Sequence, residues 1–119
     1  MVGGAAELSE IFAALANADR LAIVGAMMPC DDSKLPVMTI TQLARATSLS
    51  RFAASRHLRV LVDVGVVEVA RQGRASFHRL RGEALTPIED WLYATVDALE
   101  RARRNAPVPG PQFRVAGAA

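Results

Sequence analysis

The chain has 119 residues and a formal net charge of +2, with 51% hydrophobic and 22% charged residues, which is the composition of one ordinary folded domain. We expect neither a membrane span nor a signal peptide, because its apolar runs are short and its first ten residues lack a basic segment followed by an apolar one. The single cysteine, Cys30, excludes an internal disulfide and favours a location in the reducing cytoplasm.

Positive charge is concentrated in the middle of the chain. Residues 38–82 contain eight arginines and two carboxylates, whereas residues 1–37 contain five carboxylates and two basic residues, and residues 83–104 contain five carboxylates and three arginines. The planar guanidinium of arginine matches phosphate groups and guanine edges. The block therefore favours a face that binds a polyanion, and the alternative is a solvated arginine-rich surface without a partner.

Two helices are predicted before residue 30. Residues 7–16 place apolar side chains at helical spacing, namely Leu8, Ile11, Phe12 and Leu15. A second helix is expected from Asp19 to about Met28, with Asn17 or Asp19 as its N-cap. Residues 29–38 then form a loop rich in proline and acidic residues, which is either a sensing element or a plain surface loop.

A helix-turn-helix pattern follows this loop. Thr39 and Gln42 form a capping-box pattern for a helix over about 40–47, and Ser50 is a suitable N-cap for a helix over 51–64. The second helix carries a buried stripe made of Ala54, Leu58 and Leu61. The side chains that then project outward are Arg51, Phe52, Ser55, Arg56 and Arg59, with His57 at the boundary.

The hydrophobic period changes from helical to alternating after this pattern. Residues 66–71 and 75–80 are rich in β-branched and alternating residues and predict a β-hairpin. Arg71 and Arg74 lie at its tip, where the side chains have nothing to pack against. His78, on the second strand, is expected to be a half-exposed strand residue rather than a ligand.

A last helix is predicted over 87–104, with Thr86 as its N-cap. Its broad apolar face contains Ile88, Trp91, Leu92, Thr95, Val96 and Leu99. We interpret Trp91 as a core or dimer anchor rather than a group that stacks on a ligand. Residues 106–119 hold prolines and small residues and are expected to be a disordered tail, which leaves 1–105 as one domain.

Two short helices, an arginine-rich second helix and a basic hairpin predict a winged helix-turn-helix, a mainly α fold with a small β-hairpin wing (α+β). The major groove of DNA admits one helix, and residues near its N-terminus reach the base edges. A basic wing can lie along phosphates or in the adjacent minor groove.

Three groups of residues support a family resemblance over about residues 8–100. They are Phe12-Ala13-Ala14-Leu15-Ala16 with Asp19-Arg20-Leu21-Ala22-Ile23, then Ser55-Arg56-His57-Leu58-Arg59-Val60-Leu61 with Gly65-Val66-Val67, and last Arg71-Gln72-Gly73-Arg74. As a set they resemble the opening, the recognition block and the wing of the ArsR/SmtB (arsenic-repressor) family of bacterial winged-helix repressors. Residues 80–92 resemble a subgroup of self-repressing members that do not sense metals.

The resemblance implies a homodimer that is built on the first and last helices, binds a near-palindromic operator in double-stranded DNA and represses transcription. The residues expected at the DNA are Thr41, Ser50, Arg51, Phe52, Ser55, Arg56, His57, Arg59, Arg71 and Arg74. The residues expected at the dimer interface are Leu8, Ile11, Phe12, Ile88, Trp91, Leu92, Val96 and Leu99. Two alternatives stay open: His57 contacts DNA or packs between helices, and Phe52 presses on a thymine methyl group or folds back on the turn.

The chain departs from the metal-sensing members of this family. Residues 41–45 lack a pair of thiols, the last helix lacks histidine, and one cysteine with two histidines cannot form a transition-metal site within a subunit. A site shared across a dimer would need oxygen ligands. We therefore expect no cofactor and no metal response. The signal is then an apolar small molecule between the terminal helices, oxidation of Cys30, or none beyond autorepression.

Two other function classes compete with a repressor. The first is a winged-helix dimerisation or interaction module that does not bind DNA, against which the outward arginines count. The second is a small enzyme, for which the sequence offers no nucleophile–base pair, no carboxylate dyad and no glycine loop for phosphates.

Overall fold

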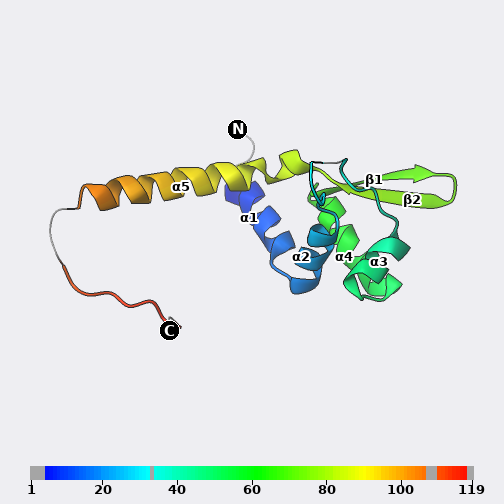
Figure 1. Cartoon of the computed structure of the whole chain (residues 1–119), viewed down its shortest axis with the longest axis horizontal. Helices are drawn as coiled ribbons and strands as arrows, with labels where there is room; N and C mark the ends of the chain where they lie inside the picture. The colour runs from blue at the N-terminus through cyan, green and yellow to red at the C-terminus, as the bar shows by residue number, and fades with distance from the viewer. Residues whose placement is uncertain (1–4, 33, 107–109, 118–119) are drawn as a thin grey trace. The chain divides into compact units, whose positions relative to one another are not determined.

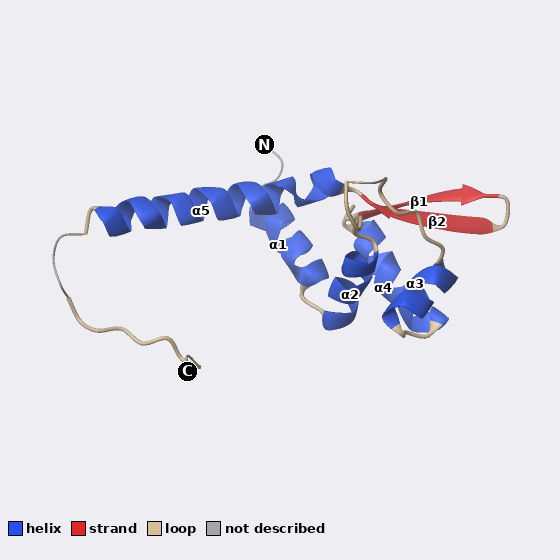
Figure 2. Cartoon of the chain, viewed as in Figure 1, coloured by secondary structure: helices blue, strands red, loops and turns tan. Residues whose placement is uncertain are grey.

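The computed structural model describes residues 5–32, 34–106 and 110–117. Its elements are, in order, α1 (Ala5–Leu15), α2 (Ala18–Ala26), α3 (Ile40–Thr47), α4 (Arg51–Asp63), β1 (Val67–Gln72), β2 (Ala75–Leu80), a 3₁₀ turn η1 (Gly82–Leu85) and α5 (Thr86–Arg104). Figure 1 follows the chain by colour, and Figure 2 separates its helices from its two strands. The chain divides into two compact units, Met1–Glu89 and Asp90–Ala119. The mainly α fold with a β-hairpin wing is confirmed.

Side-chain caps determine where the helices of the first unit begin. The Asn17 side chain accepts a hydrogen bond from the Arg20 N–H at 3.0 Å, so Asn17 rather than Asp19 is the N-cap of α2. The capping box of α3 is confirmed, because the Thr39 N–H donates to Gln42 Oε1 at 2.9 Å and the Gln42 N–H donates to Thr39 Oγ1 at 3.2 Å.

The turn between α3 and α4 is tight. Ser48 adopts a left-handed conformation with φ of +60°, which reverses the chain directly after α3. The Ser50 hydroxyl oxygen accepts a hydrogen bond from the Ala53 N–H at 3.0 Å, which confirms Ser50 as the N-cap of α4. In Figure 1, α3 and α4 lie together beside the base of the hairpin.

The wing is an antiparallel hairpin in which Val67 pairs with Leu80 and Gln72 pairs with Ala75. This register leaves Gly73 and Arg74 as a two-residue turn, and Gly73 has the positive φ of +65° that such turns need.

The expectation that His78 is half-exposed is wrong. His78 is only 5% exposed, because the segment that precedes α3 lies against β2 and covers it. The backbone groups of Met38 and His78 exchange two hydrogen bonds of 2.8 Å, and His78 Nδ1 lies 3.0 Å from the Met38 carbonyl oxygen. The end of the loop over residues 29–38 is thereby joined to the wing.

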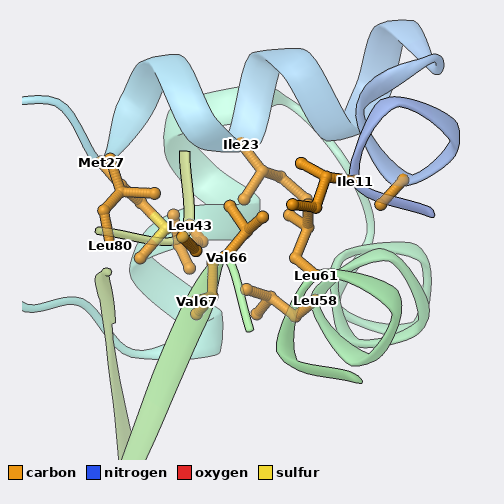
Figure 3. Close-up of a cluster of buried hydrophobic side chains, with 11 residues drawn as sticks. Ile11, Ile23, Met27, Leu43, Leu58, Leu61, Val66, Val67 and Leu80 are labelled. Carbon is orange, nitrogen blue, oxygen red and sulfur yellow. The ribbon is translucent and has the colours of Figure 1, made fainter. Parts of the chain in front are cut away.

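The core of the first unit collects side chains from its helices and from both strands. Figure 3 shows these side chains converging, the labelled ones being Ile11, Ile23, Met27, Leu43, Leu58, Leu61, Val66, Val67 and Leu80. The predicted stripe of α4 is confirmed, since Ala54, Leu58 and Leu61 are at most 2% exposed. Burial of one face of α4 leaves its opposite face to solvent.

The expectation that Thr86 caps the last helix is wrong. Thr86 itself has helical angles, with φ of −56° and ψ of −40°, because η1 leads directly into α5 and no extended residue separates them. No residue of α5 is fully buried. Residues 106 and 110–117 form no helix or strand, and the other residues of the expected tail, 107–109 and 118–119, lie outside the described residues.

Candidate nucleic-acid interface

The outward face of α4 carries the side chains that the sequence places at DNA. Arg51, Phe52, Ser55, Arg56 and Arg59 are all exposed. Phe52 is 72% exposed, and the Arg56 guanidinium carbon lies 5.7 Å from the centre of its ring. This is a cation–π distance. Phe52 therefore does not fold into the turn, and its ring and the Arg56 guanidinium form one exposed surface at the start of the helix.

A groove of about 300 Å³ joins the N-terminal ends of α3 and α4 to the tip of the wing. Its walls bring together Thr41, Arg51 and Arg74, three residues that are predicted to contact DNA and are far apart in sequence. The groove also contains Thr39, whose hydroxyl group caps α3, and Ser76; the sequence analysis placed neither of them at DNA. Ser76 comes two residues after Arg74 in the hairpin, and this spacing could have indicated that Ser76 lies in the same groove.

The chemistry of this groove suits an oxyanion. Arg51 and Arg74 supply two permanent positive charges, and neither forms an ion pair among the described residues. The N-terminus of α3 adds the positive end of a helix dipole. A phosphate of a nucleic-acid backbone matches this combination of charge and hydroxyl donors.

The arginines of the middle block divide into two groups. Three of them are paired with carboxylates of the chain: Arg59 with Asp63 at 3.5 Å, Arg79 with Glu68 at 2.7 Å, and Arg81 with Glu83 at 3.6 Å. The others are exposed and form no ion pair within the described part of the chain; they are Arg45, Arg51, Arg56, Arg71 and Arg74. The arginines of the unpaired group include Arg51 and Arg56 near the start of α4, and Arg71 and Arg74 near the tip of the wing.

His57 and Ser50 are engaged inside the chain. The His57 side chain is 20% exposed, and its ring nitrogens face Arg20 and Asp19 of α2 at 3.3 and 3.5 Å. These contacts match the helix-packing alternative for His57. The Ser50 hydroxyl oxygen is used as the cap of α4, and its exposed position leaves the hydroxyl hydrogen available to a partner.

The residues expected at a dimer interface differ in exposure. Ile11 is 4% exposed and belongs to the core of its own chain, so it has almost no surface to offer a partner. Leu8 and Ile88 are partly buried, and Ile88 packs against that core. The apolar residues that stay exposed are Phe12, Trp91, Leu92, Val96 and Leu99, and also Tyr93, which the sequence analysis did not include.

Two features are absent from the residues that the structure describes. No group of three or more His, Cys, Asp or Glu side chains lies close enough to hold a metal ion. No helix is both long and apolar enough to cross a membrane.

Similarity to known proteins agrees with this geometry. A family model described as a helix-turn-helix domain matches residues 15–70, a range that contains α2, α3, α4 and the start of the wing. No curated protein sequence matches the chain.

Solved structures extend the similarity over a larger share of the chain. An ArsR-like transcriptional regulator from Rhodococcus sp. RHA1 is 28% identical, with a TM-score of 0.70 over 87% of this chain and 92% of that one. HlyU from Vibrio cholerae N16961 is 27% identical, with a TM-score of 0.60 over 75% of this chain and 91% of that one.

A third structure is the homodimeric winged helix-turn-helix DNA-binding domain of a possible ArsR-family regulator from Mycobacterium bovis. It shares the fold at 24% identity, with a TM-score of 0.58 over 88% of each chain. The helix-turn-helix match and these neighbours identify a DNA-binding transcriptional regulator. The chain is a winged helix-turn-helix protein that resembles transcriptional regulators of the ArsR family in sequence and fold.

Proposed function

We propose that the chain is a homodimeric repressor that reads a near-palindromic operator. The helix over residues 51–64 of each copy enters one of two successive major grooves, and the wing over 71–75 lies on the neighbouring phosphates or minor groove. The single observation that carries this proposal is the set of arginines at the start of α4 and at the wing tip that form no ion pair with any described residue. Arginines of this kind are available to a partner that supplies negative charge, such as the phosphates of DNA.

A dimer is supported by the apolar residues that α1 and α5 leave exposed. Phe12, Trp91, Leu92, Val96 and Leu99 are each 38–65% exposed in the single chain. The four exposed residues of α5 follow one face of that helix, and an apolar stripe of this kind usually marks a protein–protein surface. Two-fold symmetry would also match the two halves of a palindrome. The similar Mycobacterium bovis domain is described as homodimeric.

Selection of DNA by the purified protein tests the proposal. The protein is incubated with a random-sequence duplex library, and the enriched sequence is then compared with a scrambled duplex in gel shifts at several salt concentrations. We expect a near-palindromic sequence and an affinity that falls steeply with salt, as counterion release requires. If no sequence is enriched and binding to DNA is absent, the chain is a winged-helix interaction module and the proposal is wrong.

Repression is tested separately from binding. The selected sequence is placed over a promoter that drives a reporter gene in bacterial cytoplasm, and the reporter is measured with and without the protein. We expect a lower signal with the protein, and a higher signal would make the chain an activator.

The chain is also proposed to respond to no transition metal. Residues 41–45 contain no thiol, and α5 contains no histidine. Metal sensing needs soft or imidazole ligands at fixed spacing. Zinc, cadmium or nickel added to the complex with the selected duplex should leave the gel shift unchanged, whereas release of the DNA would contradict this part of the proposal.

A further inference from the structure

Arg20 of α2 connects two helices that are not its own. Its Nε–H donates a hydrogen bond to the Ala14 carbonyl oxygen, and its Nη2 lies 3.5 Å from the Ala13 carbonyl oxygen. Both carbonyls belong to the last turn of α1, which contains no basic residue of its own. Arg20 therefore supplies the positive charge that stabilises the C-terminal end of a helix.

The same guanidinium also contacts the recognition helix. Arg20 Nη1 lies 3.3 Å from Nδ1 of His57, which projects from α4. Because a guanidinium only donates hydrogen bonds, Nδ1 of a neutral imidazole must accept, and the ring proton then belongs on Nε2. The other nitrogen, Nε2, faces Asp19 Oδ2 at 3.5 Å. Asp19 and Arg20, two consecutive residues of α2, thus hold His57 from both sides of its ring.

This network lies next to the face that is proposed to read DNA. His57 follows Arg56 directly on α4, and its side chain is only 20% exposed, so its contacts restrict the rotation of α4 about its axis. On the opposite side of the network is α1, whose exposed Phe12 belongs to the proposed dimer surface. Arg20 thus joins α1 and α4 through its polar contacts.

We propose that Arg20 is a positioning residue for DNA recognition. Through His57 it fixes the orientation of α4 against α1, so that the two recognition helices of a dimer meet the two halves of the operator in register. This inference rests on the proposed function. Arg20 touches no DNA in this account, and its loss should therefore reduce discrimination between sequences rather than general attraction to DNA.

The test compares three variants of the full chain: Arg20→Met, Arg20→Lys and the control Arg103→Met. Arg103 lies in the last turn of α5 and is exposed, so its replacement removes the same charge without touching the network. Each variant is checked for folding by thermal unfolding, and its affinity is measured for the selected near-palindromic duplex and for the scrambled duplex. The protonation of the His57 ring is read from ¹⁵N NMR of the wild-type protein at pH 8.

For Arg20→Met we expect about a tenfold loss of affinity for the selected duplex, the order of magnitude for losing a hydrogen bond to a charged group, and a change below about twofold for the scrambled duplex. Arg20→Lys should fall between Arg20→Met and the wild type, because one ammonium group cannot reproduce the fixed fork of a guanidinium. Arg103→Met should keep the wild-type ratio of the two affinities. The wild-type His57 ring should carry its proton on Nε2.

Two results would overturn the proposal. One is a folded Arg20→Met variant with the wild-type ratio of affinities, or with equal losses on both duplexes. The other is a wild-type His57 ring that is protonated on Nδ1, which needs no variant and decides the matter even if Arg20→Met fails to fold. A wild-type protein that enriches no DNA sequence would instead refute the proposed function, while the ring measurement would still report on the contact between Arg20 and His57.

Discussion

The helices α4 and α5 are both amphipathic, but the chain buries the apolar face of α4 and leaves that of α5 largely exposed. The apolar stripe of α4 is at most 2% exposed, and its outer face carries arginines. In α5 no residue is fully buried, and the apolar side chains of Trp91, Leu92 and Val96 are each about half exposed. The charged face of α4 thus suits a polyanion, whereas the apolar face of α5 suits another protein surface.

The strongest test of this comparison introduces negative charges on the apolar face of α5. In Leu92→Glu/Val96→Glu, two carboxylates would enter the proposed interface from each copy, and desolvating unpaired charges is costly. We expect the dimer dissociation constant to rise at least about 100-fold, since interface residues of this kind contribute about 2 kcal/mol or more. Analytical ultracentrifugation measures the change.

The matched control is Ala94→Glu. Ala94 is exposed and lies on the side of α5 opposite to Leu92 and Val96, so the added charge should stay in solvent and leave the dimer intact. Equal dissociation constants for the double variant and the wild type would show that the apolar face of α5 does not hold the dimer together.

The next largest effect is on folding. Leu61 of α4 is 0% exposed, and Leu61→Ala should lower the free energy of unfolding by about 2–5 kcal/mol, the usual cost of a cavity in a core. Leu99 of α5 is 65% exposed, and Leu99→Ala should lower the free energy of unfolding by less than about 0.5 kcal/mol. This variant is measured in the Leu92→Glu/Val96→Glu background, so that dimerisation does not contribute to the difference. Urea unfolding compares the two leucines, and equal losses would remove the distinction between α4 and α5.

Two arginines of the interface should differ in what their loss changes. Arg56 lies on α4, and Arg56→Ala should cost about 1–3 kcal/mol on the selected duplex and much less on the scrambled one, as expected for a residue that reads bases. Arg74 lies in the turn of the wing, and Arg74→Ala should weaken both complexes alike and reduce the salt slope by about 1. Gel shifts on both duplexes measure this, and equal losses for Arg56→Ala would contradict base recognition by that residue.

The smallest effect is expected where an arginine already has a partner. Arg79 and Glu68 form an ion pair of 2.7 Å between half-exposed side chains. Arg79→Ala should change stability by at most about 1 kcal/mol, as exposed ion pairs do. Its effect on DNA affinity should be smaller than that of Arg74→Ala. Should the two variants weaken the selected complex equally, pairing with a carboxylate would not separate the two groups of arginines.

Features that depend on neighbouring residues could be predicted from the sequence. The capping box of Thr39 and Gln42, the cap at Ser50 and the buried stripe of α4 all follow from spacings of three or four residues. The hairpin of the wing also follows from its own residues, because glycine tolerates the positive φ at Gly73, although the first strand extends one residue further than predicted, to Gln72.

Features that depend on distant residues could not be predicted in this way. His78 is buried by Met38, forty residues earlier, and no pattern around His78 indicates that pairing. The contacts of His57 with α2 are of the same kind, and so is the burial of Ile11 in its own core. Thr86 has the residue type of a cap, but the turn before it is already helical, so tertiary context overrides the local signal.

Hydroxyl-radical footprinting of the full chain on the selected duplex tests the central claim most directly, because it locates the protein on each DNA strand. If two copies of α4 occupy successive major grooves, two protected patches should appear about one helical turn, or 10–10.5 base pairs, apart. Arg74→Ala should weaken protection at the phosphates beside each patch. A single patch, or uniform protection along the duplex, would contradict recognition by a symmetric pair of helices.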